Sequence, residues 1–262
     1  PVVSDAFVKN RATGKRSWRT VLVGTLRGGG RGLFALDVTN PAAFAEANAK
    51  SIVMWEFNNT HDAHLGYTFS EPTIALMNDG RWAAITGNGY GSDPGLAELL
   101  ILYLDGGLDD TWTDGTGGTD ADYQRISTNS GSIADKNGLS TPALVDLDGN
   151  GTADRAYAGD LHGNLWAFDL NSASPAAWGV AHSDVPLFTG RSNQPITVKP
   201  IIIRHPTESQ GTDPNLLVLF GTGRFLTKAD RSTTDTQTFY GIWDNGDYGI
   251  DHNDLVAQTV AT

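Results

Sequence analysis

The sequence has no cysteine among its 262 residues. This absence excludes disulfide bonds, thiolate metal sites and cysteine nucleophiles, although it does not identify the compartment. Long apolar runs are also missing, because no window approaches the 18 apolar residues that a membrane-spanning helix needs. The first ten residues have neither the basic end nor the apolar core of a signal peptide. A targeting signal, if the full protein has one, is therefore expected upstream of Pro1.

Glutamate is scarce, and nearly all the acidity comes from aspartate. The chain has 25 Asp and 5 Glu, and its net charge is −12. Aspartate favours turns and loops, where its short side chain caps the backbone or binds cations. A surface of this charge repels phosphate backbones, so nucleic acid is not expected as a partner, whereas divalent cations suit it well.

Glycine and proline, in contrast, are abundant. The 31 glycines and 11 prolines separate short apolar runs, and this pattern favours many strands and turns over long helices. A chain of this length can bury a sizeable core, either as one large all-β domain or as two ordinary domains.

Four copies of one strand pattern run along the chain. Each copy begins with a proline that opens an apolar strand, where proline loses no ladder hydrogen bond: Pro1–Val3, Pro72–Ala75, Pro142–Val145 and Pro200–Ile203. A second β-rich run ends in glycine: Thr20–Gly24, Ala83–Gly87, Arg155–Gly159 and Leu217–Gly221. A third run ends in aspartate: Leu33–Asp37, Ile101–Asp105, Leu165–Asp169 and Phe239–Asp244. Weaker elements are also predicted: a fourth strand at Ile52–Phe57, Tyr123–Ser127, Val185–Thr189 and near Leu255–Val260, and a short helix at Ala42–Lys50.

The copies have the length and strand number of propeller blades. The glycines that end the second runs are 63, 72 and 62 residues apart, and four strands per unit of this size are typical of a β-propeller with long loops. We predict an all-β fold in a single propeller region, with approximate blades at residues 1–60, 61–130, 131–192 and 193–262. The alternative is a β-sandwich with coincidental spacing, which three parallel sets of motifs disfavour. Because the chain opens at one blade's first strand and ends inside another's last, we expect a larger ring of about six to eight blades, with further sequence on one or both sides.

The third copy carries an acidic loop with the spacing of a calcium site. An apolar strand, Leu139–Val145, leads into the loop Asp146–Asp154, and a second strand follows at Arg155–Gly159. Calcium takes six to eight oxygen ligands in a flexible shell, and alternating positions of a curled loop converge on one point. Gly151 permits the turn that brings the second half of the loop round. The predicted calcium ligands are the side chains of Asp146, Asp148, Asn150 and Asp154 and the main-chain carbonyl of Thr152.

This loop differs from an EF-hand. The bidentate glutamate that an EF-hand has at position 12 falls here on Tyr157, which belongs to the next strand, so Asp154 has to serve as the late carboxylate. Magnesium fits poorly because it requires a tight octahedron. The alternative is an acidic hairpin turn without metal, in which inward-facing carboxylates would repel one another. The matching turn of the preceding copy, Asn78–Gly80, is expected to be a plain short turn.

Other polar motifs are weaker candidates. His61 and His64 could clamp a metal but have no evident third ligand, so we expect a polar loop there. The glycine-rich Gly28–Gly32 leads into a strand and lacks the Lys-Ser/Thr of a phosphate loop, so it is expected to be a hairpin turn. Arg224 is expected to pair locally. There is no Ser/His/Asp arrangement with a nucleophile elbow and no carboxylate pair outside turns, so the chain is not expected to be an enzyme.

Several stretches resemble a known family of propellers. Trp55 and Trp178 each follow an Ala-x-Asp run, which resembles the repeat of quinoprotein-type propellers, and both are expected to pack between blades. More specifically, the chain resembles the C-terminal domain of the PilY/PilC proteins of type IV pili. The resemblance covers nearly the whole chain in order: Trp18–Leu26, Gly29–Thr39, Gly66–Pro72, Asn137–Pro142, Ala158–Trp166, Phe220–Phe225 and Phe239–Asp244.

The resemblance implies a seven-bladed, modified propeller at the pilus tip or outer cell surface. It also implies that calcium in the Asp146–Asp154 loop is linked to pilus extension against retraction. The implied partners are pilus subunits such as minor pilins, or a receptor on a host or surface. Two departures matter: the N-terminal half and the closing blades of such proteins are absent, and no Arg-Gly-Asp tripeptide occurs.

Three functions compete at this point. The first is a non-enzymatic, calcium-binding propeller of a pilus-associated adhesin or biogenesis factor. The second is an integrin-like adhesion propeller, which one calcium loop in four blades disfavours. The third is a quinone-dependent dehydrogenase. Such enzymes resemble this repeat but typically have adjacent cysteines and a calcium ion at the ring centre, whereas this sequence has no cysteine and its calcium loop is in a turn at the edge of a blade.

Overall fold

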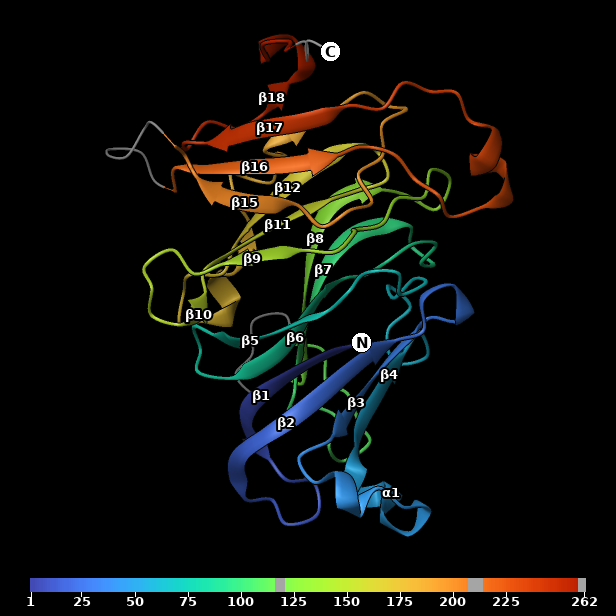
Figure 1. Cartoon of the computed structure of the whole chain (residues 1–262), viewed down its shortest axis with the longest axis vertical. Helices are drawn as coiled ribbons and strands as arrows, with labels where there is room; N and C mark the ends of the chain where they lie inside the picture. The colour runs from blue at the N-terminus through green and yellow to red at the C-terminus, as the bar shows by residue number, and fades with distance from the viewer. Residues whose placement is uncertain (116–120, 207–213, 259–262) are drawn as a thin grey trace.

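The described residues form four sheets that follow one another along the long axis, from the blue sheet at the bottom of Figure 1 to the orange-red sheet at the top. The computed structural model describes residues 1–115, 121–206 and 214–258. Within each sheet, the main strands that follow one another in the chain pair antiparallel. Some of their connections are short turns, such as residues 78–81, and others are long loops, such as residues 38–52.

The first sheet is a four-stranded meander, and the second is a meander of four strands with a fifth, very short strand paired at its edge. The first consists of β1 (Val2–Lys9), β2 (Arg16–Thr25), β3 (Gly32–Asp37) and β4 (Val53–Asn58). The second consists of β5 (Thr73–Met77), β6 (Trp82–Gly87), β7 (Leu96–Tyr103) and β8 (Tyr123–Gly131). Both sheets keep the predicted order of runs, but two strand ends differ: β2 continues past Gly24 to Thr25, and β7 ends at Tyr103, before Asp105.

The third and fourth sheets keep the same first three strands. The third has β9 (Ala143–Val145), β11 (Arg155–Gly159) and β12 (Asn164–Asp169), and both β13 (Gly179–Val180) and β14 (Phe188–Thr189) pair with β12. The fourth has β15 (Ile201–Arg204), β16 (Leu216–Gly221) and β17 (Phe239–Asp244).

Two very short strands join neighbouring sheets. β10 (Thr152–Ala153) lies inside the acidic loop of the third sheet but pairs in parallel with β5 of the second. β18 (Ile250–Asp251) follows the fourth sheet in the chain but pairs in parallel with β14 of the third. Neither strand was predicted, because two residues show no periodicity and the pairing partner is remote in sequence.

Three apolar clusters fill the spaces between successive sheets. One lies between the first and second sheets, one between the second and third, and one between the third and fourth. The middle sheets are therefore buried on both faces, which explains near-continuous apolar strands such as β7. Trp55 is 1% exposed in the first cluster and Trp178 is 7% exposed in the second, as predicted for tryptophans that pack between blades.

The weaker elements differ in part from expectation. The predicted helix at Ala42–Lys50 is instead two 3-10 turns, η2 (Pro41–Ala43) and η3 (Glu46–Asn48), followed by the one-turn helix α1 (Ala49–Ile52). The predicted strand Leu139–Val145 is regular only at β9, because Pro142 has no N–H to donate and Leu139 forms an isolated bridge to Asp160.

The predicted fourth strands vary in length. β4 and β8 are full strands, whereas the strand predicted at Val185–Thr189 is reduced to β14. Near the C-terminus, the part of Leu255–Val260 up to residue 258 is irregular, and the last two residues of that range lie outside the described residues. The remaining 3-10 turns are η1 (Arg27–Gly29), η4 (Pro175–Ala177), η5 (Lys228–Ser232) and η6 (His252–Asp254). No helix among the described residues has the length and apolarity to cross a membrane.

Candidate metal centre

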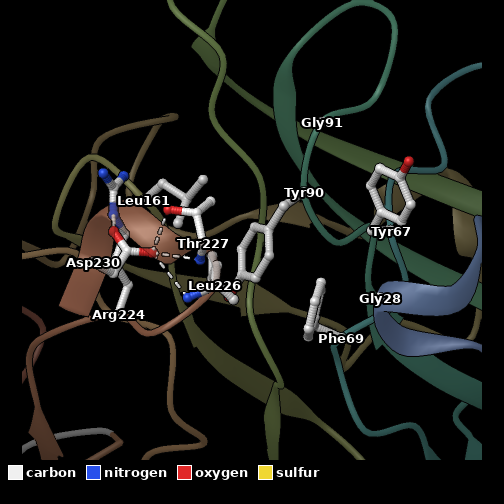
Figure 2. Close-up of a pocket in the computed structure, with 10 residues that line it drawn as sticks. All are labelled: Gly28, Tyr67, Phe69, Tyr90, Gly91, Leu161, Arg224, Leu226, Thr227 and Asp230. Atoms are coloured by element: carbon white, nitrogen blue, oxygen red, sulfur yellow. Dashed lines mark hydrogen bonds and ion pairs between the residues drawn. The ribbon is translucent and has the colours of Figure 1, made fainter.

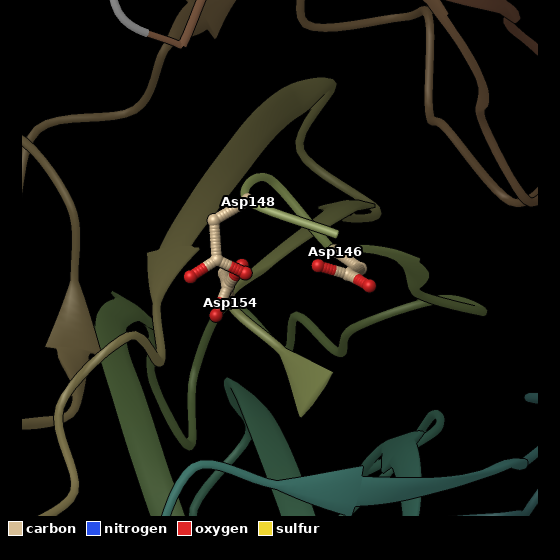
Figure 3. Close-up of side chains that lie close together, drawn as sticks. All are labelled: Asp146, Asp148 and Asp154. Carbon is tan, nitrogen blue, oxygen red and sulfur yellow. The ribbon is translucent and has the colours of Figure 1, made fainter. Parts of the chain in front are cut away.

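The acidic loop lies at the edge of the third sheet and joins β9 to β11. Figure 3 shows the carboxylates of Asp146, Asp148 and Asp154 gathered there, and one oxygen from each lies within 4.8 Å of the others. None of the three forms an ion pair with a described residue. The structure therefore brings together the three carboxylates that the sequence placed in one site.

Backbone hydrogen bonds hold the first half of the loop in a tight curl. The carboxylate of Asp146 accepts hydrogen bonds from the amides of Gly151 (2.8 Å) and Gly149 (2.7 Å), and these bonds, the one from Gly151 foremost, lower its pKa. Gly149 and Gly151 have φ angles of 80° and 90°, which side chains other than glycine rarely adopt. The curl thus needs glycine for its backbone conformation, as expected for Gly151.

The middle of the loop is a chain of short-range hydrogen bonds. The amide of Asn150 donates to Asp148 Oδ1 at 3.0 Å, and the Asn150 side-chain amide donates to Asp148 Oδ2 at 3.0 Å. Asn150 Oδ1 in turn accepts from the amide of Thr152 at 2.7 Å and from the Thr152 hydroxyl. Asn150 and Thr152 therefore fix the path of the loop around the carboxylates. Their part as ligands remains a prediction.

Asp154 differs from the other two carboxylates because it is buried. It is 1% exposed, whereas Asp146 and Asp148 lie on the surface. Its Oδ2 accepts from the amide of Leu147 at 2.7 Å, and its Oδ1 accepts from the side chain of Asn78 at 2.9 Å. A carboxylate oxygen has two lone pairs, so each of these atoms can still ligate an ion.

The donor set suits a hard divalent cation. All the candidate ligand atoms are oxygens, three of the groups are carboxylates, and the loop is short and mostly exposed, which is the chemistry of calcium sites. A buried carboxylate beside two others is electrostatically unfavourable unless positive charge is supplied. The residues present therefore fit a bound calcium ion, with Asp146, Asp148 and Asp154 as the core of its site.

Sequence reasoning missed one residue of this site. Asn78 belongs to the turn after β5 in the second sheet, and that turn was expected to be plain. It is a short turn, with the Gly80 amide donating to the Met77 carbonyl at 2.9 Å, but the Asn78 side chain reaches the loop of the next sheet. No local sequence signal separates it from an ordinary turn asparagine.

The weaker candidates serve structural purposes. His64 Nδ1 lies 2.7 Å from the buried carboxylate of Glu98, while His61 accepts from the Asn58 amide and stacks on Phe57, so the two histidines have separate partners. The glycine-rich segment forms η1 in the turn between β2 and β3, as predicted.

A hollow of about 410 Å³ lies elsewhere, among the loops that follow the second strands of the sheets and the segment that leads into β5 (Figure 2). Phe69 and Tyr90 form one wall with ring centroids 5.9 Å apart, and Arg224 and Asp230 lie opposite. Arg224 Nε donates to Asp230 at 2.9 Å, which confirms the predicted local pairing. The same carboxylate accepts from the amide of Thr227 and so caps the start of η5. The Arg224–Asp230 pair therefore stabilises this 3-10 turn.

Comparison with known proteins identifies the family. A family model described as the PilY1 beta-propeller domain matches residues 2–260. The chain belongs to this family. The stacked sheets agree with a propeller domain of this family. The resemblance to the PilY/PilC proteins that the sequence motifs indicated is confirmed.

Individual relatives agree with this assignment. The chain is 40% identical over 296 residues to the type IV pilus biogenesis factor PilY1 of Pseudomonas aeruginosa UCBPP-PA14, covering 100% of the chain and 23% of that relative. It is 40% identical over 253 residues to a PilY1 homolog of Xylella fastidiosa Temecula1, covering 93% and 16%. The crystal structure of the Pseudomonas aeruginosa PilY1 C-terminal domain matches with a TM-score of 0.76 and 37% identity, covering 95% of the chain and 49% of that domain. The chain thus spans less than a quarter of the length of these curated relatives.

Proposed function

We propose that this chain is the calcium-binding propeller region of a type IV pilus biogenesis factor, and that it acts by binding rather than by catalysis. Two lines support the proposal. The relatives that match along the chain carry the name of such a factor. The acidic loop offers three converging carboxylates in a curl built for an oxygen-ligated cation.

The observation that carries the calcium assignment is the convergence of Asp146, Asp148 and buried Asp154. A bound calcium ion would neutralise their mutual repulsion, and Asn150 and the Thr152 carbonyl would complete the set of oxygens. The free energy of binding would offset the cost of ordering the exposed part of the loop. Calcium would therefore decide whether this edge of the third sheet presents a fixed or a loose surface.

We infer that calcium binding, by fixing this surface, regulates the balance between pilus extension and retraction. We infer that it also regulates attachment to surfaces. The partners that fit this role are pilus subunits such as minor pilins, or a receptor on a host or surface. The place of action is then the cell surface or the pilus itself. Net charge of −12 is consistent with this, because protein or cation partners are favoured over nucleic acid.

The calcium assignment is tested by titration of the wild type and the Asp148→Ala variant from about 0.1 μM to about 10 mM calcium, which spans the affinities of sensor and extracellular sites. We expect saturable binding by the wild type and at least about tenfold weaker binding by the variant, because one of three carboxylates is lost. Asp247→Ala, which removes an exposed turn aspartate far along the chain, serves as the matched control. Equal calcium affinity in wild type and Asp148→Ala removes the assignment.

The regulatory role is tested separately in cells. Asp148→Ala is introduced into the full-length biogenesis factor, and sheared surface pili are quantified with calcium and with a chelator. We expect the wild type to respond to calcium and the variant to behave in calcium as the wild type does in chelator. A variant that binds no calcium yet keeps normal, calcium-responsive pili contradicts the regulatory role.

A further inference from the structure

The metal loop of the third sheet is held by a residue of the second. Asn78 stands directly after β5, and Asp154 lies 76 positions further along the chain. The side-chain oxygen of Asn78 accepts from the Thr152 hydroxyl at 2.9 Å, on the loop. Its amide nitrogen lies 2.9 Å from Asp154 Oδ1. The half-buried Asn78 thus contacts Thr152 in β10 and Asp154 directly after it.

The same amide group also reaches the main chain of the third sheet. Asn78 Nδ2 lies 3.1 Å from the carbonyl of Ala153 and 3.0 Å from the carbonyl of Leu170. An amide nitrogen has two hydrogens, and with three acceptors this close both hydrogens of Asn78 Nδ2 are donated. The Asn78 side chain is therefore fixed in position, and it fixes the Asp154 carboxylate in turn.

Backbone pairing reinforces this connection. Within β10, Thr152 pairs with Leu76 and Ala153 pairs with Met77 of β5, in a parallel register. Ala153 is 4% exposed and belongs to the apolar cluster between the second and third sheets. The second half of the metal loop is therefore part of the contact between two blades, while the first half is exposed.

We propose that Asn78 is a positioning residue for the metal site, and that an ion in the loop tightens the contact between the second and third sheets. The inference rests on the proposed calcium function. Asn78 donates to one oxygen of Asp154 and the Leu147 amide donates to the other, so the carboxylate is aimed before an ion arrives. An ion that binds this carboxylate holds β10 against β5.

Loss of the Asn78 side chain should weaken ion binding without removing a ligand. Removal of an outer-shell partner of a metal ligand typically lowers metal affinity about 10- to 100-fold. We expect calcium affinity of the Asn78→Ala variant to fall by about tenfold or more. The matched control is Asn245→Ala, which truncates a turn asparagine that directly follows β17 and bonds to Asp247. We expect its calcium affinity to equal that of the wild type.

Hydrogen exchange tests whether the ion tightens the contact between the sheets. If Asn78 affected only the affinity of the loop for calcium, its loss would leave the amide exchange of β5 at saturating calcium unchanged. We expect saturating calcium to slow amide exchange in the wild type both in the loop, residues 146–151, and in β5. In Asn78→Ala at saturating calcium, we expect the loop to be protected and β5 to exchange as it does without calcium.

A second variant covers the case in which Asn78→Ala fails to fold. Thr152→Val removes the hydroxyl whose oxygen lies 2.9 Å from Asn78 Oδ1 and also contacts Asn150 Oδ1, and it leaves the Thr152 carbonyl in place. We expect a smaller loss of calcium affinity in the same direction, with weaker calcium protection of β5.

The outcomes separate the two proposals. A wild type that binds no calcium contradicts the proposed function itself. If the wild type binds calcium, two results contradict the inference about Asn78 and leave the metal site standing. One is an Asn78→Ala variant whose calcium affinity equals that of the wild type, and the other is wild-type β5 exchange that does not respond to calcium.

Discussion

At the scale of single residues, the number of hydrogen-bond donors around an aspartate decides what it can do in this protein. Asp154 is buried but accepts only one side-chain or main-chain hydrogen bond on each oxygen, so it can still ligate an ion. Asp146 and Asp148 are exposed and available to an ion, whereas Asp160 is fully buried. Asp160 accepts four hydrogen bonds, from the amide of Asn164 (2.8 Å) and the side chains of Asn137 (2.9 Å), Asn164 (2.9 Å) and Trp166 (2.8 Å). All four partners are donors, so only a group that accepts on both oxygens satisfies them.

We therefore predict that Asp160→Asn destabilises the fold by about 2–3 kcal/mol although it conserves shape, because the new amide nitrogen must face a buried donor. Urea unfolding measures the change as a shift of the midpoint. The control is Asp169→Asn, whose exposed side chain accepts one hydrogen bond from Asn171 and should change stability by less than about 0.5 kcal/mol. Equal midpoints for Asp160→Asn and wild type would show that the buried network tolerates an amide.

At the scale of elements, strands with strong local signals were predictable and those defined by remote partners were not. Proline at the start of β5 and glycine at the end of β6 mark these strands in the sequence itself. β10 and β18 have no such signal, because each is two residues long and exists only as a pairing with another sheet. The candidate site divides in the same way: its loop ligands share one motif, whereas Asn78 is recognisable only in three dimensions.

The 3-10 turn η5 gives an element-scale prediction about pH. Asp230 caps η5, and the backbone hydrogen bonds from Thr227 and Leu226, strengthened by Arg224, lower its pKa from 3.8 to about 2. A pKa that is lower in the folded state means that the cap stabilises the fold above pH about 4 and that this stabilisation is lost as the pH falls toward about 2.

We predict that Asp230→Asn has a lower melting temperature than the wild type at pH 7, and that the difference shrinks between pH about 4 and pH about 2, as the wild-type carboxylate becomes protonated. Thermal unfolding of both proteins across this pH series measures the difference. Asp235→Asn, at an exposed carboxylate that accepts from the Thr233 hydroxyl, is the control and should track the wild type throughout. A gap for Asp230→Asn that stays constant from pH 7 to pH 2.5 would contradict the ionic cap.

At the scale of the whole molecule, the glycine repeated near the end of the second strands reflects how the sheets stack in the second and third sheets, whereas at Gly24 an added β-carbon would meet Phe34 of the same sheet. A β-carbon on Gly87 would lie 2.2 Å from the carbonyl oxygen of Ser140 in the third-sheet segment, and one on Gly159 would lie 2.1 Å from Ile196. A β-carbon on Gly221 would meet no described atom within 4 Å. The same sequence motif is thus closely packed against the following segment in the middle sheets, whereas the described residues leave open space beside Gly221.

This difference yields a prediction with its control at an equivalent position. We expect Gly87→Ala to destabilise the protein by about 2–3 kcal/mol, because the added methyl group overlaps fixed backbone and forces the second and third sheets apart. Gly221→Ala, also at the last residue of a second strand, should change stability by less than about 0.5 kcal/mol. Urea midpoints of the two variants and the wild type measure both effects.

If the two substitutions have equal effects, the repeated glycine serves the conformation of the strand and not the close approach of neighbouring sheets. If only Gly87→Ala is costly, the spacing between blades is set by backbone contact at this glycine, which is also the interface that the Asn78 connection spans.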